Sequence, residues 1–331
     1  MAGGASEAAR TAFAEGLSEA LYGPEAAVIA PLHTLDEGVA GYVFDLVPLR
    51  AAVQGLEQSP PEPGTPKRPG TPGPREHLFT VPPPVTPIDT LVPLLRASLG
   101  PLPTRKLRTV HSAGSPHEIL RIIQDAGADL FDAHWVQRAA DVGVALDFTF
   151  PAPSDGRTNA DSGHNLYDTK YTTDFVRLAD AFRGTSEDKN DANLPICPCI
   201  ACSPRELSPP LSHDSISGRR ESKPARPYTR AYLHHLLHTH EMSAHAFLTA
   251  HNLAVLHAFF AGVRAVLGGT DGQAAFKREA ARFEEAYDST MEVIERGRLD
   301  WVMVERARGK GWLTREKEKQ KLDSLGTAVE L

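Results

Sequence analysis

Residues 107–132, with the sequence LRTVHSAGSPHEILRIIQDAGADLFD, contain the signals that decide the fold. The stretch opens with a short apolar run that is typical of a strand. Ser115, Pro116 and Glu118 then mark the start of a helix as N-cap, first-turn proline and capping-box glutamate. Gly127 ends this helix, and Asp132 closes a second short strand that follows at once. The order strand, helix, strand predicts neighbouring parallel strands in an α/β sheet.

The segments on either side continue this alternation of strands and helices. Further strands are predicted for residues 26–32, 39–46 and 144–150, and helices for residues 9–21, 91–99, 171–182, 228–240, 243–267 and 276–287. The strands are short apolar or alternating runs, whereas the helices repeat apolar residues at helical spacing. We therefore expect a mainly parallel sheet, either open or closed into a barrel, with functional groups at the C-terminal ends of its strands.

The composition is that of a soluble globular protein. The chain has 331 residues, of which 41% are hydrophobic and 23% charged, and its formal net charge is −7. This acidic balance argues against wholesale wrapping of nucleic acid, although basic residues gather near residues 219–230 and 306–321. The N-terminus lacks an apolar signal region, and no uninterrupted apolar run reaches the roughly 18 residues of a spanning helix.

Two stretches rich in proline, serine or glycine are predicted to be disordered insertions, near residues 59–84 and 203–227. We expect three regions along the chain. The first is a partial β/α barrel at residues 1–185, the second is a metal-binding subdomain at residues 186–270, and the third is a helical tail at residues 271–331.

Cys197, Cys199 and Cys202 are the only cysteines of the chain and lie in the short sequence CPCIAC. Three thiolates and one imidazole make a closed tetrahedral set that suits Zn²⁺. The clustering of every thiol in one loop favours a metal site over a disulfide or three unrelated buried thiols. Spacing alone leaves the fourth ligand open among seven histidines, which are His234, His235, His238, His240, His245, His251 and His257.

The residues around and after the cysteines resemble the zinc region of the tRNA-guanine transglycosylases. That family has C-x-C-x-x-C, then R-A-Y-L-H-H-L, then a histidine followed by asparagine, and this chain has CPCIAC, TRAYLHHLL and the pair HN at His251. The resemblance implies that Cys197, Cys199, Cys202 and His251 bind one structural Zn²⁺ per subunit. It also implies that the other histidines are surface or core residues.

The strand sequence GADLFD resembles the G-(I/V)-D-(M/L)-F-D strand of the same family, whose final aspartate is the nucleophile of the catalytic members. That position is Asp132 here, but AHWVQR replaces the P-T-R segment that follows it in those members. The next residues, AADVGVALDF, are closer to the T-E-R-G-x-A-L-x-F pattern of the family's non-catalytic eukaryotic branch. The chain also lacks the S-D-S-G-G and G-G-L-A-V-G-E stretches that supply a second carboxylate and a glycine-backed base pocket. The resemblance therefore implies no catalytic residue, with Asp132 inactive.

The resemblance covers roughly residues 28–267 and implies a (β/α)8 barrel with an inserted helical zinc-binding subdomain. Family members carry several more strands ahead of this region, so we expect only the C-terminal half of the barrel. Open sheet edges are rarely stable unless they are covered. Either the sequence is truncated, which we favour, or the missing strands come from elsewhere.

Three functions remain as hypotheses. The leading one is a non-catalytic accessory subunit of a heterodimeric transglycosylase, which exchanges guanine for queuine at wobble position 34 of tRNAs with GUN anticodons. Its partners would be tRNA and the catalytic subunit, which residues 228–267 would contact through at least one of Phe259 and Phe260, unless both pack in the chain's own core. The alternatives are an active transglycosylase with Asp132 as nucleophile and a zinc-dependent module that binds another protein. We expect a cytoplasmic location, with peripheral attachment at the mitochondrial outer membrane as an alternative.

Overall fold

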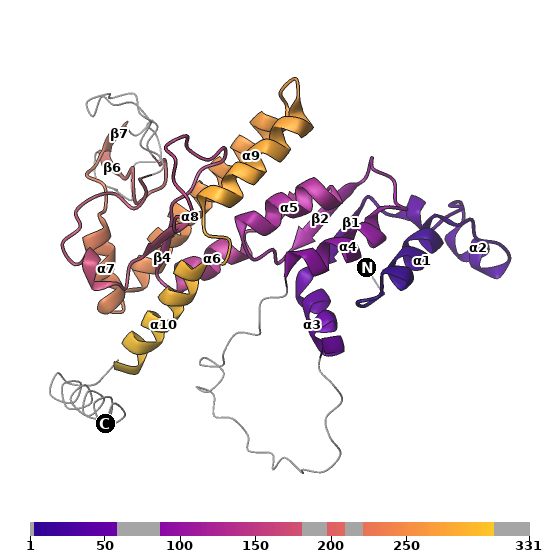
Figure 1. The fold of residues 1–331 in the computed structure, drawn as a ribbon, viewed down its shortest axis with the longest axis horizontal. Helices are drawn as coiled ribbons and strands as arrows, with labels where there is room; N and C mark the ends of the chain where they lie inside the picture. The colour runs from indigo at the N-terminus through magenta and orange to yellow at the C-terminus, as the bar shows by residue number, and fades with distance from the viewer. Residues whose placement is uncertain (1–2, 58–86, 181–196, 209–220, 308–331) are drawn as a thin grey trace, which may run out of the picture. The chain divides into compact units, whose positions relative to one another are not determined.

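The computed structural model describes residues 3–57, 87–180, 197–208 and 221–307. The chain forms two compact units whose segments interleave along the sequence, and Figure 1 shows their helices and strands. The first unit contains Met1–Arg138, Phe148–Ala160 and Val255–Thr290, and the second contains Ala139–Asp147, Asp161–Ala254 and Met291–Leu331. The predicted insertion near residues 59–84 lies outside the described residues.

The first unit is built around a parallel sheet. Its strands, in order across the sheet, are β1 (Gly41–Asp45), β2 (Leu107–His111) and β3 (Leu130–Phe131). Val43 of β1 lies opposite Thr109 of β2, and both strand pairs are parallel. The prediction of an α/β fold with a parallel sheet is therefore confirmed, and the described residues contain three strands of this sheet rather than a closed barrel.

The helices of the first unit lie before, between and after these strands in the sequence. They are α1 (Glu7–Ser18), α2 (Pro24–Ile29), α3 (Leu46–Glu57), α4 (Ile88–Leu99), α5 (Pro116–Ala126), most of α6 (His134–Asp141), the C-terminal part of α8 (Met242–Leu267), α9 (Gly272–Ala286) and the 3-10 turn η1 (Asp36–Gly38). α1 packs on α4, α4 on α5, and α5 on α9.

α5 begins and ends as its sequence predicts. The Ser115 hydroxyl accepts a hydrogen bond from the Glu118 N–H at 3.1 Å, and Pro116 occupies the first turn. At the other end Gly127 has φ +69°, a left-handed conformation that glycine adopts without steric cost. These contacts are local, and the sequence alone therefore specifies both helix boundaries.

An aromatic cluster forms part of the core of the first unit. The ring centroid of Phe148 lies 5.8 Å from that of Phe259 and 5.9 Å from that of Phe283. Phe259 is 0% exposed, so the expectation that it contacts a partner protein is wrong. Phe260 is half-buried and stacks on Phe131 with a centroid distance of 6.0 Å.

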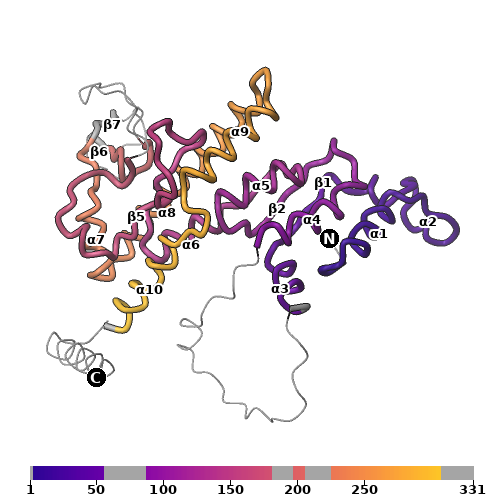
Figure 2. Tube along the Cα trace, viewed as in Figure 1, coloured from indigo at the N-terminus to yellow at the C-terminus, as the bar shows by residue number. Residues whose placement is uncertain are grey.

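The second unit combines two small antiparallel sheets with helices. Its elements are β4 (Val144–Leu146), β5 (Gly163–Asn165), the 3-10 turn η3 (Thr169–Tyr171), β6 (Arg205–Ser208), β7 (Glu221–Pro224), α7 (Arg230–His238), the N-terminal part of α8 and α10 (Glu292–Ala307). β4 pairs with β5 and β6 with β7, and Figure 2 labels β5 beside the other elements of this unit. α10 packs on β4 and β5, and the core contains Leu233, Leu237 and Leu248 together with the cysteines.

Three sequence predictions differ from the structure. Residues 26–32 were expected as a strand, but α2 occupies residues 24–29 because Pro24 favours the first turn and Glu25 and the following alanines favour a helix. The strand expected at residues 144–150 ends at Leu146. The insertion expected at residues 203–227 is paired at its two ends as β6 and β7, and its middle lies outside the described residues.

A fourth prediction, the helix expected at residues 171–182, also differs from the structure. Only η3 is helical there, and turns and bends follow as far as residue 180. The carbonyls of Asp174 and Val176 accept hydrogen bonds from the N–H groups of Ala231 and Arg230, at 2.8 and 3.1 Å. These tertiary bonds replace the intrahelical ones that the local sequence favours.

Among the described residues, α8 is long and apolar enough to cross a membrane by length and composition. Leu248, His251 and Asn252 are nevertheless fully buried in the second unit, and the two polar side chains bind the backbone of β4. These are the contacts of a core helix.

Candidate metal centre

The three cysteines lie on a tight turn in the second unit. The N–H of Cys202 donates to Sγ of Cys199 at 3.2 Å, and the N–H of Ser203 donates to the carbonyl of Cys199 at 2.8 Å. The Ser203 hydroxyl donates to the carbonyl of Cys197 at 2.9 Å. These bonds close the turn, and the three sulfurs converge to within 4.8 Å of one another.

His251 of α8 brings the fourth donor atom to these sulfurs. Its Nδ1 lies 3.5 Å from Sγ of Cys197 and 3.6 Å from Sγ of both Cys199 and Cys202. Its Nε2 lies 2.9 Å from the carbonyl of Leu146 in β4. Because a carbonyl can only accept, Nε2 carries a proton, and Nδ1 is the ring atom that can act as a ligand.

The distances match the edges of a zinc tetrahedron. With Zn–S bonds of about 2.3 Å and a Zn–N bond of about 2.05 Å, tetrahedral angles place the nitrogen about 3.6 Å from each sulfur. The observed separations are 3.5 to 3.6 Å. Three thiols and one imidazole, with no carboxylate and no open position, form the donor set of a closed structural site. The four side chains could therefore hold a metal ion as they stand.

Burial and mutual hydrogen bonds perturb the protonation of this cluster. His251 is 0% exposed, and the cysteines are 2% to 7% exposed. Hydrogen bonds from Cys197 and Cys202 lower the pKa of Cys199, whereas hydrogen bonds with Cys197 and Cys199, together with burial, raise the pKa of Cys202. Burial disfavours a charged imidazole, but hydrogen bonds with Cys197 and Cys199 outweigh it and raise the pKa of His251 to about 9. A divalent cation would displace the protons that the cluster holds without metal.

A second cluster of ionisable groups, Asp147, His164 and Asp180, also lies within 4.8 Å. Arg230 is 5% exposed, and its Nη2 donates to Asp180 at 2.9 Å and lies 2.9 Å from Nε2 of His164. The guanidinium thus supplies the positive charge that a metal ion would bring. The cluster is a hydrogen-bonded ion network that joins β4, β5 and the start of α7.

None of the six other histidines that were open as ligands joins the cysteine cluster. Nδ1 of His234 bonds the carbonyl of Leu166 at 2.9 Å, and Nδ1 of His245 bonds the carbonyl of Ala140 at 3.2 Å. His240 pairs with Glu305 at 3.2 Å. Only His251 among the seven therefore points its free nitrogen at the sulfurs.

Asn252 is a site residue whose role the sequence analysis did not identify. It is 0% exposed; its Oδ1 accepts a hydrogen bond from the Leu146 N–H at 2.9 Å, and its Nδ2 donates to the Val144 carbonyl at 3.0 Å. Together with His251, it attaches α8 to β4. The sequence did carry one signal for this role: Asn252 is a polar amide in a mostly apolar helix, directly beside a potential metal ligand.

Asp132 belongs to the first unit and follows directly after β3. Its Oδ2 accepts a hydrogen bond from the Ser112 N–H at 2.8 Å and lies 3.2 Å from Nδ1 of His111. Its Oδ1 accepts from the His134 N–H at 3.3 Å, and the side chain is 24% exposed. The carboxylate is therefore at the C-terminal ends of the strands, as predicted, and the sequence did not reveal His111 as its neighbour.

Comparisons with known proteins connect these features. The sequence model described as "Queuine tRNA-ribosyltransferase" matches residues 84–286. The chain is 30% identical over 175 residues to queuine tRNA-ribosyltransferase accessory subunit 2 of Schizosaccharomyces pombe, an alignment that covers 52% of this chain and 30% of that protein. It is 30% identical over 178 residues to the accessory subunit 2 of Xenopus laevis, covering 53% of this chain and 40% of the relative.

A further relative carries the name of the enzyme itself. The chain is 27% identical over 216 residues to the queuine tRNA-ribosyltransferase of Agrobacterium fabrum, which covers 65% of this chain and 41% of that protein. The chain thus aligns with less than half the length of each of these relatives. The family match spans more than half of the chain, and the chain therefore belongs to the queuine tRNA-ribosyltransferase family.

Proposed function

We propose that the chain is a zinc-binding, non-catalytic accessory subunit of a queuine tRNA-ribosyltransferase. It would pair with a catalytic subunit that exchanges guanine for queuine at wobble position 34 of tRNAs with GUN anticodons. The observation that carries this proposal is the similarity to relatives named accessory subunit 2 in organisms as distant as Schizosaccharomyces pombe and Xenopus laevis. The proposed fold is the C-terminal half of a (β/α)8 barrel with a zinc subdomain, in a cytoplasmic protein.

The metal would serve folding rather than chemistry. Cys197, Cys199, Cys202 and His251 would hold one Zn²⁺ with all four positions taken by protein, which leaves no place for a reactive water. Bound zinc would contribute its binding free energy to the second unit, because it joins the cysteine turn to α8. His251 would pass this restraint to β4 through its bond to Leu146.

The absence of catalysis rests on what surrounds Asp132. The carboxylate is engaged by the Ser112 N–H and by His111, and the sequence has Gly-Gly pairs only at residues 3–4 and 268–269. A two-step base exchange also needs a second carboxylate and a pocket that lets the backbone approach the purine. We therefore assign Asp132 a structural role.

The partner surface that we propose lies on the second unit around the zinc region. Phe175, Ile200 and Tyr232 are 75%, 56% and 42% exposed, although large apolar side chains of a monomer are usually covered. Hydrogen bonds connect the start of α7 to the segments that carry Phe175 and Ile200. The Ala231 N–H donates to the carbonyl of Asp174, and the Tyr228 N–H donates to that of Ala201. Aromatic side chains of this kind are typical anchors of interfaces.

Copurification with a catalytic subunit, combined with base exchange by each protein alone, tests the proposal. We expect the pair to copurify, and we expect this chain alone to incorporate no radiolabelled guanine into tRNA. The variant Asp132→Asn should copurify as well as the parent. The similarity to the Agrobacterium fabrum protein favours the second candidate, an active enzyme with Asp132 as nucleophile. Exchange by this chain alone that is lost in Asp132→Asn would establish that candidate instead.

A further inference from the structure

Two histidines of the second unit, His234 and His238, lie one turn apart on α7 and keep the same ring nitrogen free. Side chains four residues apart share one face of a helix, and the two ring centroids are 4.1 Å apart. Nδ1 of His234 lies 2.9 Å from the carbonyl of Leu166, and Nδ1 of His238 lies 2.9 Å from the carbonyl of His234. Because a carbonyl can only accept, each Nδ1 carries a proton, and each neutral ring keeps a lone pair on Nε2.

The Nε2 lone pair of His234 faces another acceptor. The Thr172 hydroxyl lies 3.4 Å from this Nε2, but it also lies 2.6 Å from the Thr169 carbonyl and donates its single proton there. Burial lowers the pKa of His234, although the bond to Leu166 opposes this effect, and the ring is therefore neutral. Two lone pairs thus face each other with no proton between them, an arrangement that a cation would satisfy.

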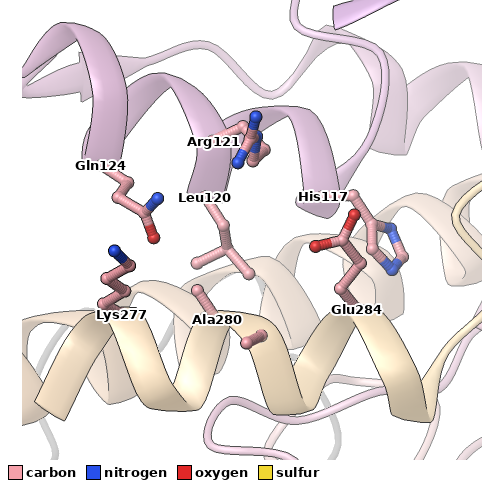
Figure 3. Close-up of a pocket in the computed structure, with 8 residues that line it drawn as sticks. His117, Leu120, Arg121, Gln124, Lys277, Ala280 and Glu284 are labelled. Atoms are coloured by element: carbon pink, nitrogen blue, oxygen red, sulfur yellow. The ribbon is translucent and has the colours of Figure 1, made fainter. Parts of the chain in front are cut away.

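This edge of the histidine pair is open to solvent. His234 is 9% exposed, but Thr172 and His238 beside it are both exposed. Within the described ranges, Nε2 of His238 makes no hydrogen bond, so two imidazole nitrogens are free on one helix face. Figure 3 shows a different arrangement in the pocket between α5 and α9, where Lys277 and Glu284 are exposed and water can solvate each charge separately.

We propose that Nε2 of His234 and Nε2 of His238 bind a late first-row divalent cation, at a second site that shares no ligand with the cysteine cluster. Imidazole nitrogen suits Zn²⁺, Cu²⁺ and Ni²⁺, and ligating histidines almost always donate their other ring N–H to an acceptor, as both do here. With bonds of about 2.05 Å, a tetrahedral ion holds two nitrogens about 3.3 Å apart. A small rotation of the exposed His238 ring can supply this spacing, and water would complete the coordination of an exchangeable ion.

Isothermal titration of the zinc-loaded full chain with Ni²⁺ tests the proposal, because zinc already fills the cysteine site. We expect saturable binding of one Ni²⁺ per chain, with the zinc content unchanged after the titration. Mg²⁺ is the ion control and should not bind, since it prefers oxygen ligands. A parallel titration with Zn²⁺ shows which of the two ions the site prefers. Ni²⁺ is paramagnetic and should also broaden two histidine ring signals in the NMR spectrum of the parent, a readout that needs no variant.

A matched pair of substitutions on α7 completes the test. His238→Asn removes Nε2 but keeps an N–H group that can donate to the His234 carbonyl, and it should weaken Ni²⁺ binding more than about tenfold. His235→Asn makes the same change at an exposed neighbour on another side of the helix and should leave binding unchanged. Circular dichroism checks that both variants fold. The proposal is overturned if the parent shows no saturable Ni²⁺ binding, if Mg²⁺ binds as tightly, or if the two variants respond alike.

Discussion

Replacing Asn252 with alanine removes the side chain that attaches α8 to β4. In the structure its amide oxygen accepts from the Leu146 N–H at 2.9 Å, and its amide nitrogen donates to the Val144 carbonyl at 3.0 Å. Asn252, Val144 and Leu146 are all 0% exposed, so water cannot replace the lost partner. The substitution therefore leaves one backbone donor and one backbone acceptor buried and unpaired.

The expected loss of stability follows from these two groups. A buried polar group that loses its partner costs about 1–3 kcal/mol, which gives about 2–6 kcal/mol for the pair. This is a large part of the roughly 5–15 kcal/mol by which a typical domain is stable. Loss of order in β4 should also release the Leu146 carbonyl that orients His251. Removal of such an outer partner typically weakens metal binding about 10- to 100-fold.

Two measurements test these effects. Urea unfolding, followed by tryptophan fluorescence, gives the free energy of unfolding, and the zinc content of the purified protein reports metal binding. Trp301 packs against the core of the second unit and reports on its unfolding. Leu253→Ala is the matched control on the next residue of α8, because Leu253 is 43% exposed and should change the free energy of unfolding far less than Asn252→Ala does. If Asn252→Ala lowers the free energy of unfolding by less than about 0.5 kcal/mol and keeps its full zinc content, the bridging role of Asn252 is refuted.

Three further predictions follow from the same contacts. Cys199→Ser should lose zinc, measured by elemental analysis, and unfold at lower urea concentration, since a structural site contributes its binding energy to folding; full metal stoichiometry in this variant would contradict the proposed ligand set. Asp132→Asn should not reduce exchange by the assembled heterodimer, and a large loss in that assay would show that Asp132 takes part in the reaction. Burial raises the pKa of Asp36, but hydrogen bonds from Tyr42 and Lys106 outweigh it and lower that pKa below 3.8. The Asp36 carboxylate therefore adds stability above about pH 4 that is lost as the pH falls through its lowered pKa. In thermal melts, Asp36→Asn should lose less stability on acidification than the parent does. Equal losses in the two proteins would refute this role of Asp36.

Short-range signals made much of the molecule predictable from sequence. Ser115 and Gly127 bound α5 through contacts within a few residues, and short apolar runs indicated β1 and β2. The spacing of the three cysteines was also sufficient to predict their convergence, because hydrogen bonds within one turn bring the sulfurs together. Each of these outcomes depends on atoms that are close in the chain.

Long-range contacts decided what the sequence left open. Seven histidines could have completed the cysteine site by spacing, and His251 does so because the Leu146 carbonyl, 105 residues away in the chain, orients its ring. Bonds to the start of α7 replaced the helix expected at residues 171–182, and packing in the aromatic core buried Phe259 where an interface was expected. Sequence therefore determined the residue types and the local turns of this protein. The tertiary structure decided which side chains meet, since partners distant in the chain satisfy the buried polar groups.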